Sequence, residues 1–482
     1  MSSPTNDRGA DPAGQLPPGV WKVVSVAAIG SFMAQLDATV VNVSLASLAA
    51  ELRVSLSTIH WVTSGYLLAL ALTLPLNGWL VDRIGAKALY LWCFASFTLS
   101  STLCGLAWSA HSLIAFRIFQ GMSGGLLAPM AQMMMARAAG RHMAQVISFA
   151  SLPILLAPLL GPVVAGAILQ FASWRWLFLV NLPVGALALA LAAAFLPNDR
   201  EETRPRSFDM LGLALLSPGL ALFLYGSDHL DERTGVAALA VALVLFALFL
   251  RSARAKGDAA LIDLRLFGGK TFSASVAAMF MINGVSFAGQ MLIPIYLVRG
   301  CGLSPSQTGW MMAPLGLGMI CGYPFMGRLV KAFGIRKLAA GGSLLSLAGT
   351  LPLVFLAQHG LVVAVLAASL FLRGAGSSAI GISSITAGYA SMERRDLPMA
   401  TTAMNIVQRL GGPTLTTLCA GFLGWRLSMT TQLASPSAAF AAAFALLCAL
   451  HALLFLATLR LPWEIPHAEP ESPAPAAEPG PA

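Results

Sequence analysis

Charged residues are scarce in this chain. Of its 482 residues only 10% are Asp, Glu, Lys or Arg, whereas 57% are hydrophobic and the mean hydropathy is +0.77. A soluble chain of this size carries about a quarter charged residues, so the composition excludes an ordinary soluble domain. The sequence therefore predicts a protein whose main solvent is lipid.

The residue patterns of enzymes and metal sites are also missing from the sequence. It contains no CxxC pair, no metal-ligand spacing and no G-x-S-x-G stretch. The polar, turn-rich first twenty residues lead us to expect no removable signal peptide. The seven histidines are dispersed, at His60, His111, His142, His229, His359, His451 and His467. We therefore expect neither an enzyme nor a cofactor or metal, and we interpret the six cysteines as small buried side chains.

What the sequence does contain is long apolar runs. A helix needs about 20 mostly apolar residues to cross the hydrocarbon core of a bilayer. Fourteen such runs occur, near residues 22–44, 59–81, 88–108, 113–135, 143–170, 175–196, 210–226, 235–251, 271–298, 308–327, 337–357, 360–386, 400–424 and 437–460. The predicted fold class is therefore an all-α polytopic membrane protein with 14 transmembrane helices.

The basic residues show which side of the membrane each loop occupies. With the N-terminus inside, 21 Lys and Arg lie in inner segments and five in outer loops, namely Arg53, Arg175, Arg233, Arg299 and Arg426. Because cytoplasmic loops are enriched in Lys and Arg, both tails, residues 1–21 and 461–482, are predicted to be cytoplasmic. The net charge of +9 thus reflects topology, not nucleic-acid binding, and the Pro- and Glu-rich C-terminal tail is expected to be disordered.

An internal repeat divides the chain into two halves. "GWLVDRIGAK" (78–87) and "GRLVKAFGIR" (327–336) share the pattern G-x-L-V-x-x-[IF]-G, and each connects two predicted spans on the inner side. Structural repeats are typical of secondary transporters. We predict an N-terminal six-helix bundle over residues 22–196 and a C-terminal six-helix bundle over 271–460. Between them, residues 197–270 form a linker with two extra transmembrane helices.

Five stretches resemble the motifs of one transporter family. "GWLVDRIGAK" is similar to the cytoplasmic signature of the major facilitator superfamily, and "LDATVVNVSL" (36–45) resembles the span-one motif of its fourteen-span drug:proton antiporters, the EmrB/QacA-like multidrug efflux transporters. The other three stretches are "RIFQGMSGG" (117–125), "LLGPVVAG" (159–166) and "SWRWLFLVNLPVG" (173–185). The resemblance implies the major facilitator fold, a proton gradient as the driving force and a bacterial inner-membrane location.

Asp37 is the residue that most needs an explanation, because it lies inside the first apolar run. One acid at the centre of a spanning helix costs roughly 2.5–3.5 kcal/mol on insertion scales. Asp37 is about 10 Å from the outer end of its span at 1.5 Å per residue, and Arg117 has a similar depth in the fourth span. A buried carboxylate stays ionised beside Arg and takes up a proton without it. We therefore predict that Asp37 carries a proton and that Arg117 gates it; the alternative is a static ion pair.

The resemblance implies two further roles. A conformational latch that stabilises the outward-facing state is implied for Gly78, Asp82, Arg83, Gly85 and Lys87. A hinge and seal in the fifth span is implied for Gly161, Pro162 and Gly166. The alternatives are a generic basic loop and an ordinary proline kink.

Polar residues within the predicted spans are candidates for a substrate cavity, and we predict this role for Gln35, Asn42, Asn283, Gln290 and Arg373. Arg373 and Arg409 both lie within C-terminal spans that contain no acid. Such arginines either bind an anionic group of a substrate or hydrogen-bond to backbone carbonyls and water.

These observations favour proton-driven export of small amphipathic compounds by alternating access, with one proton per cycle. One alternative is a dedicated exporter of a single, anionic metabolite with Arg373 as its anchor, and a remoter one is a transporter-like membrane sensor. The expected partners are a small-molecule substrate, the proton and the lipid bilayer, without nucleic acid. A periplasmic adaptor and an outer-membrane channel cannot be read from the sequence.

Overall fold

The computed structural model describes residues 18–139, 142–199, 207–230, 232–433 and 436–464, and within these ranges the chain contains helices and no strand. Most of both predicted tails lies outside the described residues. The first half of the chain forms α1 (Pro18–Leu52), α2 (Leu56–Thr73), α3 (Asn77–Ile84), α4 (Ala86–Gly105), α5 (Ala110–Ala139), α6 (Met143–Phe171), α7 (Trp176–Leu179) and α8 (Asn181–Phe195). The rest forms α9 (Met210–Asp228), α10 (Arg233–Lys256), α11 (Lys270–Ile295), α12 (Pro305–Phe333), α13 (Ile335–His359), α14 (Val363–Ala390), α15 (Leu397–Leu433) and α16 (Pro436–Thr458).

Eleven helical segments of the described part are long and apolar enough to cross a bilayer, which makes this a multi-pass membrane protein. Three of the fourteen predicted spans, those within α6, α12 and α15, are helical but are not among these eleven. Of the six cysteines, Cys93, Cys104 and Cys419 are buried as expected, whereas Cys321 is exposed on the helix surface.

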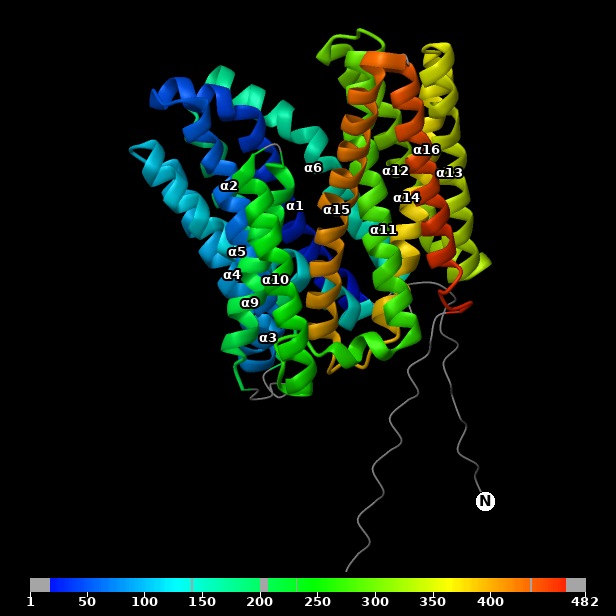
Figure 1. The fold of residues 1–482 in the computed structure, drawn as a ribbon. Helices are drawn as coiled ribbons and strands as arrows, with labels where there is room; N and C mark the ends of the chain where they lie inside the picture. Colours follow the sequence, from blue (N-terminus) through cyan, green and yellow to red (C-terminus); the bar gives the residue numbers. More distant parts are fainter. Residues whose placement is uncertain (1–17, 140–141, 200–206, 231, 434–435, 465–482) are drawn as a thin grey trace, which may run out of the picture.

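The helices pack into two groups with a helical hairpin beside them (Figure 1). In the first group α1 packs on α5, α6 and α8, α2 packs on α5, and α4 packs on α5 and α8. In the second group α11 packs on α14, α15 and α16, and α14 also packs on α12 and α13. The hairpin of α9 and α10 contacts the first group through α2 and the second through α15.

Asp209 fixes the base of this hairpin. Its carboxylate accepts hydrogen bonds from the backbone N–H of Gly212 at 2.8 Å and of Leu261 at 3.0 Å, and it forms an ion pair with Lys256 at the end of α10. Asp209 is therefore the N-cap of α9, and it also ties α10 and the segment after it to the start of the hairpin.

The two copies of the repeat have the same local conformation. Gly85 ends α3 with φ 85° and ψ 154°, and Gly334 ends α12 with φ 78° and ψ 166°. Only glycine adopts this region of backbone conformation without strain. Each glycine is followed at once by the next helix, α4 or α13, so the shared motif encodes the same tight helix–helix connection twice.

The two groups of helices touch at the end where these connections lie, which we call the basic end. A Cβ at Gly78 on α3 would lie 3.3 Å from the Cα of Met399 on α15. A Cβ at Gly327 on α12 would lie 2.9 Å from the Cα of Gln145 on α6. The first glycine of each repeat thus permits a close approach to the opposite group, and towards the other end the two groups diverge (Figure 1).

Candidate functional site

Asp37 lies in a buried hydrogen-bond network in the middle of α1, where its side chain is 1% exposed. Its Oδ2 accepts a hydrogen bond of 2.5 Å from Nη1 of Arg117 on α5. Its Oδ1 accepts bonds from Nε2 of Gln120 at 3.1 Å and from Nδ2 of Asn181 at 2.8 Å. Three donors from α5 and α8 thus surround the carboxylate, which is the environment that a buried charge requires. The structure therefore brings Asp37 and Arg117 together in one buried ion pair.

Arg117 is held on several sides at once. Nη1 also donates to Oε1 of Gln120 at 2.6 Å, and Nε donates to the backbone carbonyl of Val62 on α2 at 3.2 Å. The guanidinium carbon lies 4.2 Å from the centre of the Tyr66 ring, a cation–π geometry. Arg117 thus links α1, α2 and α5, so a relative movement of these helices would change the contacts of Asp37.

Asn181 is held in place by a further layer of hydrogen bonds. Its Nδ2 donates to Oγ of Ser101 on α4 at 3.0 Å, and the Ser101 hydroxyl donates to the backbone carbonyl of Phe178 at 3.0 Å. Both side chains are buried. The orientation of the amide towards Asp37 is therefore fixed by α4 and α7.

A cavity of about 960 Å³ lies between the two groups of helices, close to the buried network. Ligand sites in proteins range from roughly 300 to 1,000 Å³, so a drug-sized compound fits. Polar side chains contribute to its wall from α1, α5, α11 and α15: Gln35, Asn42, Gln132, Asn283, Asn405, Gln408 and Arg409. Tyr66 also faces the cavity, so this side chain contacts the cavity and the Arg117 guanidinium together.

Hydrogen bonds between the two groups close the cavity towards the basic end. Oε1 of Gln132 on α5 accepts bonds from the Tyr389 hydroxyl on α14 and from Nδ2 of Asn405 on α15, each at 2.8 Å. Nearer the basic end, Nδ2 of Asn77 donates to Oγ1 of Thr402 at 3.2 Å. These contacts join the two groups of helices between the cavity and the basic end.

The predicted latch residues lie at the basic end. Gly78 and Gly85 permit the close approach and the tight connection described above. Asp82 is half-buried in the last turn of α3, and Arg83 is exposed with its guanidinium 5.6 Å from the Trp79 ring centre. Lys87 donates from Nζ to the carbonyl of Leu196 at 2.8 Å, which ties α4 to the end of α8.

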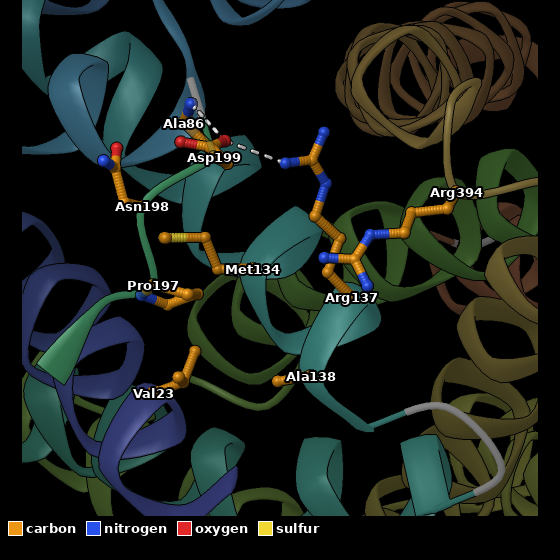
Figure 2. A pocket seen from close by; sticks show the side chains of 9 residues that line it. All are labelled: Val23, Ala86, Met134, Arg137, Ala138, Pro197, Asn198, Asp199 and Arg394. Atoms are coloured by element: carbon orange, nitrogen blue, oxygen red, sulfur yellow. Dashed lines mark hydrogen bonds and ion pairs between the residues drawn. The ribbon is translucent and has the colours of Figure 1, made fainter. Parts of the chain in front are cut away.

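Asp199, which the sequence analysis missed, organises the same region (Figure 2). Its carboxylate accepts bonds from the backbone N–H groups of Ala86 at 2.7 Å and Lys87 at 3.2 Å, at the start of α4. It also pairs with Arg137 at the end of α5 at 3.0 Å. A carboxylate on the first N–H groups of a helix compensates the positive end of the helix dipole. Arg394, from the loop between α14 and α15, extends towards Arg137 in the same small pocket (Figure 2).

Two of the three predicted hinge residues can be placed. Gly161 lies where α6 packs on α1, and a Cβ there would lie 2.5 Å from Cγ2 of Thr39. Gly166 has open space around its Cα. The side chain of Pro162 lies outside the described residues, although the backbone of α6 is helical through this position.

The cavity prediction needs a correction at two residues. Gln35, Asn42 and Asn283 line the cavity, but Gln290 and Arg373 do not. Gln290 is exposed on α11 but is not part of the cavity wall. Arg373 is 4% exposed inside the second group of helices, where Nη2 donates to the backbone carbonyl of Val285 at 3.3 Å and Nη1 has no partner among the described residues. Arg373 faces α11, on which α14 packs.

Sequence reasoning missed two contacts of Asp37, Gln120 and Asn181. Gln120 is three residues after Arg117, almost one helical turn, so its side chain lies on the same face of α5. That spacing could have identified it. Asn181 follows the turn between α7 and α8, and no local pattern indicates that its amide points towards α1. No group of three or more His, Cys, Asp or Glu side chains suited to a metal ion occurs in the part of the chain that the structure describes.

The chain is similar in sequence to known proteins. The model of the Major Facilitator Superfamily matches residues 27–288 and 274–481. A "Multidrug resistance protein B homolog" of Mycobacterium tuberculosis (strain H37Rv) is 32% identical over 425 residues, which are 86% of this chain and 78% of that protein. A "Putative multidrug resistance protein MdtD" of Klebsiella pneumoniae is 34% identical over 372 residues, 74% of this chain and 77% of that protein.

Solved structures share the fold at low sequence identity. The human organic anion transporter MFSD10 (TETRAN) superposes with a TM-score of 0.61 at 17% identity, covering 92% of this chain and 100% of that chain. The proton:xylose symporter XylE superposes with a TM-score of 0.59 at 15% identity, covering 89% and 94%. At these identities the likeness concerns the fold alone.

Proposed function

Because this chain belongs to the major facilitator superfamily, we propose that it is a proton-driven exporter of small amphipathic compounds that works by alternating access. The two relatives named above carry multidrug resistance in their names, which supports export of diverse compounds. The proposal needs a path for the compound and a carrier for the proton. The cavity is suited to the first role, and Asp37 to the second.

The buried carboxylate of Asp37 is the observation on which the proposal depends. In the described conformation it accepts three hydrogen bonds, one from a guanidinium, so its ionised form is the one that these contacts stabilise. The donors lie on α5 and α8, whereas Asp37 lies on α1. A rearrangement that separates α1 from α5 removes the cation and favours the protonated form. Alternation between the two arrangements would carry one proton across the membrane in each cycle.

Because the cavity is closed at the basic end, we infer which state of the transport cycle this conformation represents. We place the basic end in the cytoplasm, since the inner segments hold 21 of the Lys and Arg residues and the outer loops five. Both termini are then cytoplasmic, in a bacterial inner membrane, and the cavity belongs to an outward-facing state. Gly78, Asp82, Arg83, Gly85 and Lys87 act as the latch of this state, together with Asp199.

The proposal includes fourteen spans. α6, α12 and α15 are added to the eleven apolar segments because each has at least 29 residues and packs among them. Residues 22–196 and 271–460 then form the two bundles, and residues 197–270 contain the inserted hairpin. Gly161, Pro162 and Gly166 form the hinge at which α6 moves along α1.

The test is substrate-induced proton release from the purified full-length protein in detergent. A panel of cationic, neutral and anionic compounds is added to wild type, to Asp37→Asn and to a control, Glu51→Gln, which removes an exposed acid from the end of the same helix. We expect release from wild type and from the control, and none from Asp37→Asn. Equal release from Asp37→Asn would remove Asp37 from the proton path and leave it as a static ion pair.

A further inference from the structure

The cavity wall contains an arginine that forms no ion pair with an acid of the described residues. Arg409 on α15 is the one Lys or Arg among the described residues that line the cavity. The one Asp or Glu there is Asp228 at the end of α9, whose side chain is 83% exposed and lies beside His229. Asp37 does not line the cavity, and its charge is already balanced by Arg117. The formal charges of Arg409 and Asp228 therefore cancel over the wall as a whole, but Asp228 lies beside His229 and no acid is paired with Arg409.

The guanidinium of Arg409 differs from those of Arg117 and Arg373, the other two arginines inside predicted spans, in its hydrogen-bond partners. Arg117 is bound to Asp37, Gln120 and Val62. Arg373 is enclosed inside the second group of helices and donates to Val285. In the described part of the chain Arg409 forms no hydrogen bond or ion pair with protein atoms, yet none of its nitrogens is enclosed. Its donors therefore point into the cavity, where a ligand can reach them.

The surroundings of Arg409 supply the other contacts that an amphipathic anion needs. Amide side chains of Gln35, Asn283 and Gln408 line the cavity and offer further donors. The apolar part of the wall includes Leu67, Met135, Met143, Ile147, Phe287 and Ile385. Methionine side chains adapt to ligands of different shape. The cavity thus combines one fixed cation, several amides and a deformable apolar surface.

We propose that this cavity selects amphipathic compounds with a single anionic group, a carboxylate or a sulfonate, and that Arg409 binds this group. The inference rests on the proposed function, in that the cavity is the path of the exported compound. A guanidinium binds such a planar or tripodal anion through two parallel N–H donors. A cationic compound would meet the same guanidinium as a like charge with no carboxylate paired to it, so this part of the wall also discriminates against cations. The proposed substrates are therefore anions, whereas an exporter of amphipathic compounds could equally carry cations; the experiment below separates the two charge classes.

Three probes with one naphthalene body test the charge preference: naphthalene-2-sulfonate, the neutral naphthalene-2-sulfonamide, and (2-naphthylmethyl)trimethylammonium. Their affinities are measured by calorimetric titration of the full-length protein in detergent. We expect the sulfonate to bind most tightly to wild type, and Arg409→Gln to weaken it by about tenfold or more, the usual effect of losing a charge-assisted contact. The sulfonamide should change by less than about twofold. Arg409→Lys should restore part of the loss.

The control variant is Arg233→Gln, which removes one positive charge from an exposed position at the start of α10 that does not line the cavity. It should bind all three probes as wild type does. The proposal is overturned if wild type prefers the ammonium probe, or if Arg409→Gln keeps the preference for the sulfonate. An anionic lipid headgroup shares the same chemistry, so the titration is repeated in nanodiscs with and without phosphatidylglycerol. Loss of sulfonate binding with this lipid would assign Arg409 to the lipid and overturn the proposal.

Transport in proteoliposomes separates this inference from the function on which it rests. Proton-coupled transport of the ammonium probe without transport of the sulfonate would contradict the anion inference and leave the exporter intact. Binding of the sulfonate through Arg409 without proton-coupled transport of any probe would support the anion site and contradict the exporter.

Discussion

The charge moved in each transport cycle follows directly from the two sites. Under the two proposals above, Asp37 carries one proton inward, and a compound bound at Arg409 carries one negative charge outward. Both movements transfer positive charge in the same direction, so two elementary charges cross the membrane per cycle. Exchange of a monovalent cation for one proton would instead move no net charge.

The expected magnitude is large enough to measure. Moving one elementary charge through 100 mV corresponds to about 2.3 kcal/mol. Two charges therefore give about 4.6 kcal/mol, and at 1.4 kcal/mol per factor of ten the accumulation ratio of the sulfonate changes by about three orders of magnitude. The ammonium probe should show almost no dependence on the membrane potential.

The assay uses proteoliposomes in which valinomycin and potassium gradients set the potential while the pH difference is held constant. The accumulation ratio of naphthalene-2-sulfonate is measured at several potentials. Because a ratio at equilibrium does not depend on how the protein is inserted, mixed orientations do not affect it. A dependence equal to one charge would mean that no proton is exchanged. Absence of any dependence would refute the combination of one proton at Asp37 with one anion at Arg409.

Three further predictions concern the pair, the latch and the hairpin. Arg117→Met should destabilise the protein by about 3–5 kcal/mol because it leaves a buried carboxylate without its cation. In thermal unfolding, adding Asp37→Asn should recover part of this loss. If the effects of the two substitutions are additive, the two side chains do not interact. Gly78→Val should hinder the approach of α3 to Met399, so a cysteine at Asn42 should be labelled less by an impermeant maleimide from outside. The control Gly341→Val on α13, which meets open space, should leave labelling unchanged. Burial alone raises the pKa of Asp209, but hydrogen bonds from Lys256, Gly212 and Leu261 outweigh it and hold the pKa below its ordinary value. The stabilisation by Asp209 is therefore complete at pH 7 and is lost only as the pH falls through that lowered pKa; Asp209→Ala should cost about 1 kcal/mol as a lost N-cap, or more through Lys256, and an unchanged midpoint at pH 7 would contradict this.

Part of the site could be predicted because its signals are local. An acid in an apolar run is visible in the sequence, and its depth follows from the rise per residue of a helix. The same measure placed Arg117 at a matching depth, and the structure brings the two side chains together. Gly85 and Gly334 are equally local, since a glycine between two helices marks a backbone conformation that other residues avoid.

The sequence could not predict which of the two C-terminal arginines faces the cavity. It identifies both Arg373 and Arg409 as cations without an acid in their spans, and it predicts Arg373 in the cavity. The structure encloses Arg373 beside Val285 and exposes Arg409 to the cavity instead. The difference depends on which face of α14 and of α15 turns towards the first group of helices, and neither helix has a polar stripe narrow enough to specify it.

The sequence by itself determined the lipid surroundings, the all-helical class of fold and the two repeated helix–helix connections, because hydropathy and glycine positions act over one or two helical turns. It also determined that Asp37 needs a partner. Only the tertiary structure decided that Gln120 and Asn181 complete this environment, that Asp199 holds the start of α4, and that Arg409 faces the cavity. These outcomes depend on the rotation and contact of helices that are far apart in the chain, and packing between many side chains sets that rotation.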